Sequence, residues 1–165
     1  MKRLILIAVA FITIFNFLAF CQGESTKSKQ SKPEIIVLPE HERNFERLIN
    51  WLQTNALFKD KTSFIQSIRE TFNFAKTGNL EKYAYWLKIF NSELSKLDTL
   101  EMKELLNFAL SSLTPVKSKE VLPAEVPGCG ADCLLTSCRI TCPSGTKPKC
   151  QCHFFFADCG CEPYQ

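Results

Sequence analysis

The C-terminal stretch CGADCLLTSCRITCPSGTKPKCQCHFFFADCGC, at residues 129–161, decides the fold of this 165-residue chain. It contains eight of the nine cysteines of the chain: Cys129, Cys133, Cys138, Cys142, Cys150, Cys152, Cys159 and Cys161. An even set of cysteines at this density is typical of small modules whose disulfides form in an oxidising compartment. The sequence therefore predicts a cysteine-rich module over residues 129–165 that is held together by four disulfides.

Two segments of this module have the composition of strands, namely residues 138–142 (CRITC) and residues 149–156 (KCQCHFFF). The intervening PSGTKP contains the Pro and Gly residues that favour turns. We therefore predict a β-hairpin in which these two segments pair around the turn.

Three consecutive aromatic residues, Phe154, Phe155 and Phe156, end the second segment. In a strand their side chains point to alternate faces, and a two-stranded sheet cannot cover both faces by itself. We expect the three rings either to dock on the helical part through aromatics such as Trp86 or to form an exposed binding patch.

Residues 39–113 have helical hydrophobic spacing nearly throughout. Four helices are predicted, with approximate ranges 39–58, 63–77, 80–97 and 98–113. Their expected start and stop signals are Pro39, Ser63 with Gln66, Gly78, Asn79 and Asp98. Short connections between amphipathic helices predict a small all-α bundle, which we assign as a helical domain at residues 39–113. Residues 114–128 contain three prolines and no helical period, so they are expected to form an extended linker to the cysteine-rich module.

The N-terminus has the layout of an export signal. Lys2 and Arg3 precede an apolar run at residues 4–20, and we place the end of the signal at residue 21. The signal ends either by ordinary cleavage or by lipidation of Cys21. The second possibility rests on a resemblance to bacterial lipoprotein signals in Leu18, Ala19 and Cys21. Residues 22–38 are predicted to form a flexible polar tether, and the protein is expected to be extracytoplasmic, either secreted or anchored by lipid at the cell envelope.

Part of the cysteine pattern resembles the cysteine-stabilised α/β peptides of the defensin type. The similarity covers Cys138-x3-Cys142, then Cys152, then Cys159-x-Cys161. It implies a helix that carries the first two of these cysteines. It also implies an alternative function, in which proteolysis within residues 114–128 releases a defensin-like or toxin-like effector peptide from a helical pro-segment.

Metal binding and catalysis have weaker support. Thiolates with His153 could bind zinc or copper, so a thiolate metal-binding tail is a further alternative. However, C-x2-C pairs are absent and disulfides compete for the thiols, so we predict no metal and no cofactor. His41 lies among charged residues and is expected on the solvated surface of a helix. Without a phosphate-binding glycine loop, a nucleophile elbow or an HExxH motif, the chain is predicted not to be an enzyme.

The charge pattern offers no basic patch, because the formal net charge is +3 and the module balances its cations with acidic residues. Nucleic acid is therefore not an expected partner. A membrane is expected only through a lipid on Cys21 or an uncleaved signal. The favoured function is that of an exported, non-enzymatic interaction module whose disulfide-stabilised tail presents a binding surface to a protein or cell-surface partner.

Overall fold

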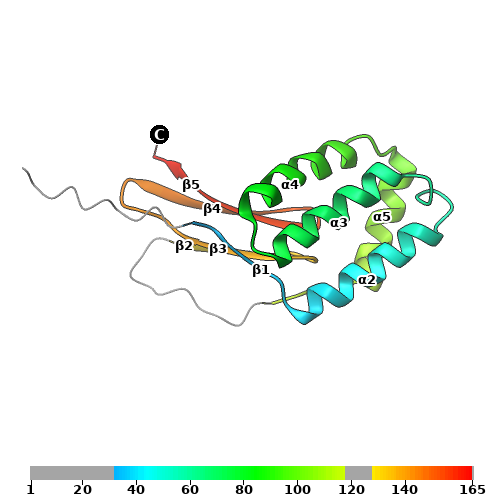
Figure 1. Ribbon diagram of the computed structural model, residues 1–165, viewed down its shortest axis with the longest axis horizontal. Helices are drawn as coiled ribbons and strands as arrows, with labels where there is room; N and C mark the ends of the chain where they lie inside the picture. The colour runs from blue at the N-terminus through cyan, green and yellow to red at the C-terminus, as the bar shows by residue number, and fades with distance from the viewer. Residues whose placement is uncertain (1–31, 118–127, 165) are drawn as a thin grey trace, which may run out of the picture. The chain divides into compact units, whose positions relative to one another are not determined.

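The computed structural model describes residues 32–117 and 128–164. The predicted export signal, Cys21, most of the tether and the central part of the linker lie outside the described residues. Four helices are followed by strands that carry four disulfides, which confirms the predicted fold class (Figure 1).

The helices agree with the hydrophobic periodicity. They are α2 (Pro39–Thr54), α3 (Thr62–Lys76), α4 (Leu80–Leu94) and α5 (Thr99–Ser112). Asn79 caps α4 by accepting a hydrogen bond from the backbone N–H of Lys82. At the start of α5, Asp98 and Glu101 form a reciprocal capping box. The predicted cap at Ser63 is wrong, because α3 begins at Thr62 and Ser63 lies within its first turn.

Five strands form two separate sheets. Strands β1 (Glu34–Ile36), β2 (Gly128–Asp132) and β3 (Ser137–Thr141) form an antiparallel sheet of order β1-β3-β2. Strands β4 (Thr146–His153) and β5 (Phe156–Pro163) form an antiparallel hairpin. The sequence did not predict β1, which lies within the expected tether and pairs with β3 through Glu34 opposite Arg139.

The predicted strands exist, but their predicted pairing is wrong. The segment at residues 138–142 contributes β3, which pairs with β1 and β2, whereas β4 pairs with β5. The turn after β3 contains Gly145 at φ +88°, a conformation that favours glycine, and it leads from one sheet to the other. The second reversal occurs at Phe154 and Phe155, which separate β4 from β5.

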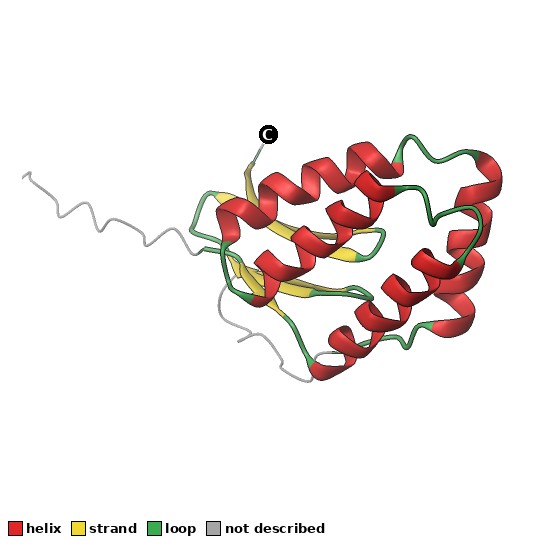
Figure 2. Ribbon diagram, turned by 45° about the vertical axis from the view of Figure 1, so that its right-hand side comes forward, coloured by secondary structure: helices red, strands yellow, loops and turns green. Residues whose placement is uncertain are grey.

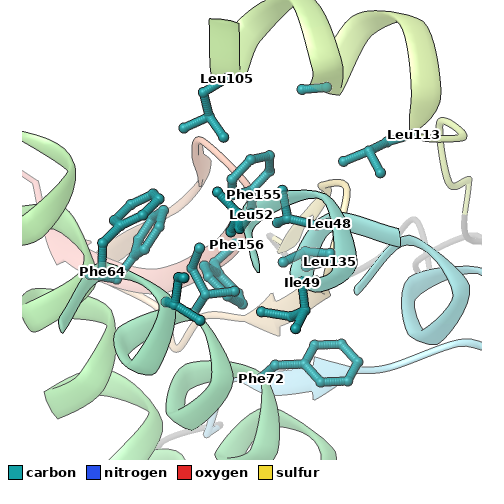
Figure 3. Packing of buried hydrophobic residues seen from close by; sticks show 14 of the residues in the cluster. Leu48, Ile49, Leu52, Phe64, Phe72, Leu105, Leu113, Leu135, Phe155 and Phe156 are labelled. Atoms are coloured by element: carbon teal, nitrogen blue, oxygen red, sulfur yellow. The ribbon is translucent and has the colours of Figure 1, made fainter. Parts of the chain in front are cut away.

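One hydrophobic core includes residues from the helices and from the disulfide module. Leu135, Phe155 and Phe156 are fully buried among side chains of all four helices (Figure 3). In Figure 2, α4 runs beside the β4–β5 hairpin, in agreement with ring contacts from Phe90 to Phe155 and Phe156. The described parts of the chain belong to a single compact unit.

Candidate functional site

Four disulfides crosslink the two sheets of the module. The pairs are Cys129–Cys150, Cys133–Cys152, Cys138–Cys159 and Cys142–Cys161. The first two connect β2 and the loop after it to β4, and the other two connect β3 and the loop after it to β5. Their Cα–Cα distances of 5.7 to 5.9 Å are ordinary for disulfides. All eight cysteines predicted to be paired are therefore paired.

The resemblance to cysteine-stabilised α/β peptides does not extend to the fold. Cys138 lies in strand β3 and Cys142 directly follows this strand, so neither cysteine is on a helix. A spacing of four places two side chains on the same face of a helix and also on the same face of a strand. The spacing alone could not distinguish the two structures.

The disulfides also occupy the cysteines that the metal-binding alternative would need as ligands. The sulfurs of Cys129, Cys150 and Cys159 lie within 4.8 Å of one another, but each is bonded to another sulfur. His153 instead lies 2.8 Å from the side-chain nitrogen of Gln151 and 3.4 Å from a carboxylate oxygen of Asp158. The described cysteines thus offer no thiolate, and the alternative of a thiolate metal-binding tail is not supported.

The three consecutive phenylalanines have different environments. Phe155 and Phe156 are fully buried, and their ring centroids lie 6.2 and 5.1 Å from that of Phe90. Phe154 has a positive φ of 57° in the turn, is partly exposed and packs edge-to-face on Phe155. Phe155 and Phe156 dock on the helices, which was one of the two expected arrangements. Their ring contacts on the helices are with Phe90 and not with Trp86. An exposed patch made of all three rings is therefore wrong for this structure.

A buried polar contact from α4 reinforces this docking. The hydroxyl of Tyr83 donates to the carbonyl oxygen of Ala157 at 2.5 Å, and it lies 3.3 Å from Thr136 Oγ1. Thr136 Oγ1 in turn accepts a hydrogen bond from the backbone N–H of Ala157 at 2.8 Å. Burial raises the pKa of Tyr83 far above its ordinary value, so the hydroxyl stays protonated and remains a donor. Tyr83 lies within the helix predicted at residues 80–97, and the sequence carries no signal for this bond.

Two polar residues connect α2 to the module in the same way. Asn44 is 1% exposed, and its side-chain nitrogen donates to the carbonyl oxygens of Thr114 and Leu134 at 2.8 and 2.9 Å. Its side-chain oxygen accepts the N–H of Thr114 at 3.0 Å. One side chain therefore joins α2, the segment after α5 and the loop between β2 and β3.

The second is His41, which is fully buried, so its predicted position on the solvated surface is wrong. Nδ1 accepts the backbone N–H of Leu38 at 2.9 Å, and the proton of the neutral ring is therefore on Nε2. Nε2 lies 3.4 Å from Ser137 Oγ. Burial lowers the pKa of His41, while a hydrogen bond to the backbone of Cys133 and two nearby carboxylates oppose this effect. The ring thus bridges the start of α2 and the module in its neutral form.

The side of the β4–β5 hairpin that faces away from the disulfides has a polar surface. Its residues lie in opposite pairs, with Lys147 across from Glu162, Lys149 from Gly160 and Gln151 from Asp158; Gly160 and Glu162 are half-buried and the other four are exposed. We call these six residues the hairpin face. An ion pair of 2.7 Å between Lys149 and Glu162 raises the pKa of the lysine and lowers that of the glutamate. At Gly160 an added Cβ would meet no atom within 4 Å, so the centre of this face is open.

Two further observations bear on the class of protein. In the described ranges, no helix has the length and apolar character needed to cross a membrane. No protein-family model matches the chain, and neither the curated proteins nor the solved structures include a significant match.

Proposed function

We propose that this protein is exported and acts as a non-enzymatic interaction module, in which the hairpin face binds a protein or cell-surface partner. Four disulfides among eight cysteines indicate an oxidising environment, which supports an extracytoplasmic location. At this location the protein is either secreted or anchored to the cell envelope by a lipid on Cys21.

The observation that carries this proposal is the combination of a rigid backbone with an uncovered polar face. All four disulfides connect to β4 or β5, and the buried ends of these strands are bonded to Tyr83 and packed on Phe90. A surface whose conformation is already set loses little conformational entropy when it binds. The mixed charges of the face suit a polar protein surface better than an anionic polymer.

The environment of the two histidines supports a non-enzymatic role. His41 is fully buried, and both of its ring nitrogens face hydrogen-bonding groups of the protein. His153 lies beside Gln151 and Asp158, neither of which is a nucleophile that a histidine base could activate.

Release of an effector peptide is the weaker alternative. Cleavage between residues 114 and 128 would leave Phe155 and Phe156 in the shared core and Tyr83 bonded to Ala157. A module that contributes two fully buried phenylalanines to this core would stay attached after its linker is cut.

The proposal is tested by placing a bulky charged side chain in the open centre of the hairpin face. Gly160→Arg is expected to fold normally, because the space around the Cβ position is empty. Asn50→Arg, at an exposed position on α2, is the matched control. The full chain, expressed under oxidising conditions, is measured for binding to the surface of cells from its own source organism.

The expected result is that wild type and Asn50→Arg bind alike, whereas Gly160→Arg loses binding at an unchanged melting temperature. Binding that is unaffected by Gly160→Arg, or no saturable binding by the wild type, would contradict the proposal.

A further inference from the structure

We propose that a depression between the end of α2 and the first half of α3 binds an oxyanion, in the form of a carboxylate or phosphate group on a small ligand. The depression has a volume of about 430 Å³. Its lining residues come from α2, the connection after it and α3: Gln53, Lys59, Thr62, Ile65, Gln66 and Arg69. This site is separate from the hairpin face and goes beyond the proposed function.

The first argument is the positive charge of two side chains in this depression, Lys59 and Arg69. The side chains of Lys59 and Arg69 are exposed, and neither forms an ion pair or hydrogen bond with any residue in the described ranges. No carboxylate lines the depression. Two cations in a hollow whose lining contains no acidic residue create a positive local potential there, which attracts an anion.

Two other depressions on the helices provide a comparison. One also borders Arg69, but Glu42 and Glu46 line it, and Lys76 there is paired with Glu42 at 2.8 Å. Their carboxylates would repel an incoming anion.

The other lies near the start of α3 and includes Asp60 and Glu93. Its lysines are also paired, since Lys61 contacts Glu101 and Lys96 contacts Glu93. Of these three hollows, only the one at Lys59 and Arg69 combines cations with an absence of acidic lining residues.

The second argument is the supply of neutral donors and an apolar floor. The guanidinium of Arg69 can bind two oxygens of a carboxylate or phosphate at once. The side-chain amides of Gln53 and Gln66 and the hydroxyl of Thr62 can donate further hydrogen bonds. Ile65, which is 8% exposed, provides an apolar contact for the carbon part of the ligand. Charged donors, neutral donors and one apolar contact can together bind the charged and the carbon parts of a small organic anion.

The test is a titration of the isotope-labelled full chain, in which the NMR chemical shifts of the backbone amides are measured at each ligand concentration. Inorganic phosphate and acetate are the two probes, and sodium chloride keeps the ionic strength constant. Saturable shifts confined to residues 53–69 are expected. Saturation by phosphate alone assigns a phosphate group, saturation by acetate alone assigns a carboxylate, and saturation by both assigns their shared oxyanion chemistry.

Arg69→Gln is expected to weaken this binding about tenfold or more, because a charge-assisted hydrogen bond is lost. Its melting temperature should not change, because the Arg69 side chain has no partner within the described structure. Lys88→Gln removes one exposed cation from α4 and is the matched control, with no expected effect on affinity. Shifts that never saturate, or an equal loss of affinity in Arg69→Gln and Lys88→Gln, would show only general charge attraction and would overturn the proposal.

Discussion

The helical region and the disulfide module differ in what determines their structure. In α2 to α5, side chains three and four residues apart form the buried faces, so local spacing predicts each helix. In the module, strands are joined by bonds between residues 19 or 21 positions apart in sequence. The partner of each cysteine follows from the three-dimensional arrangement of two sheets and not from local spacing.

The difference has a consequence for stability. Helices of 14 to 16 residues are marginal alone and need tertiary packing. The module is too small to bury its own aromatic rings, but its disulfides limit the freedom of its unfolded chain. Each region thus lacks something that the other provides: the helices cover Phe155 and Phe156, and the module completes the helical core.

Removal of a disulfide should have the largest effect on the module. In the double variant Cys138→Ala with Cys159→Ala, loss of the bond should lower the free energy of unfolding by about 2 to 5 kcal/mol. Both sulfurs are nearly buried, so a cavity adds to the loss of the crosslink. Chemical denaturation of the non-reduced protein provides the measurement, and stability equal to that of the wild type would contradict the assigned pair.

Asn44 tests the polar connection between the two regions. Asn44→Ala removes three part-buried hydrogen bonds to the backbone of Thr114 and Leu134, and each lost bond should lower the free energy of unfolding by about 1 kcal/mol. Asn50→Ala on the same helix is the control, since Asn50 is exposed. Equal melting temperatures for the two variants would exclude this bridge.

Acid should weaken the same connection through His41. Because burial lowers the pKa of His41 in the folded state, the unfolded chain binds this proton more readily. The contribution of His41 to stability is therefore complete above the unfolded pKa of about 6.5 and is lost as the pH falls through the lower folded pKa. Protonation of Nδ1 also breaks its bond to Leu38. The carboxylates of Asp132 and Glu40 face the ring and reduce the effect without reversing it.

Denaturant midpoints between about pH 7.5 and pH 5 would measure this dependence. The decrease on acidification should be smaller in His41→Gln, which cannot titrate at this position, than in the wild type. An identical pH profile for His41→Gln and the wild type would show that His41 has no such role.

The ion pair on the hairpin face should have the smallest effect. The side chains of Lys149 and Glu162 are exposed, and their attraction is screened by water and salt. Glu162→Gln should leave the melting temperature almost unchanged while it alters the charge that a partner meets. A large destabilisation would mean that the face has a structural role in addition to its exposure.

Much of the fold could be predicted from the sequence, because helices, caps and cysteine density are local signals. Asn79 and Asp98 cap helices as their spacing predicts. The strand pairing could not be predicted, since residues 138–142 and 149–156 are equally compatible with pairing to each other or to other strands. The β4–β5 hairpin reverses at Phe154 and Phe155, where hairpin turns usually have Gly or Asn. Without these turn residues, the sequence contained no indication of a hairpin at this position.

The polar bridges were missed for a different reason. His41 and Asn44 lie seven and four residues before Leu48, on the buried stripe of α2. Their position was a usable signal, but the charged neighbours of His41 favoured a surface interpretation for that residue, and no role was predicted for Asn44. When a polar residue has the helical spacing of the apolar residues that follow it on the same helix, it can be interpreted as a buried hydrogen-bonding group.

The central claim is that the helices and the module share one core through the phenylalanines of the β4–β5 turn. It is tested most directly by the thermal unfolding of the variants Phe156→Ala and Phe154→Ala. The circular dichroism signal of the helices is the quantity measured during heating. Phe156 is fully buried against Phe90, so its loss should destabilise the helices by about 3 to 5 kcal/mol although it lies outside them. Phe154, which is partly exposed, should have a much smaller effect. A helical melting curve that is the same for Phe156→Ala and the wild type would contradict the shared core.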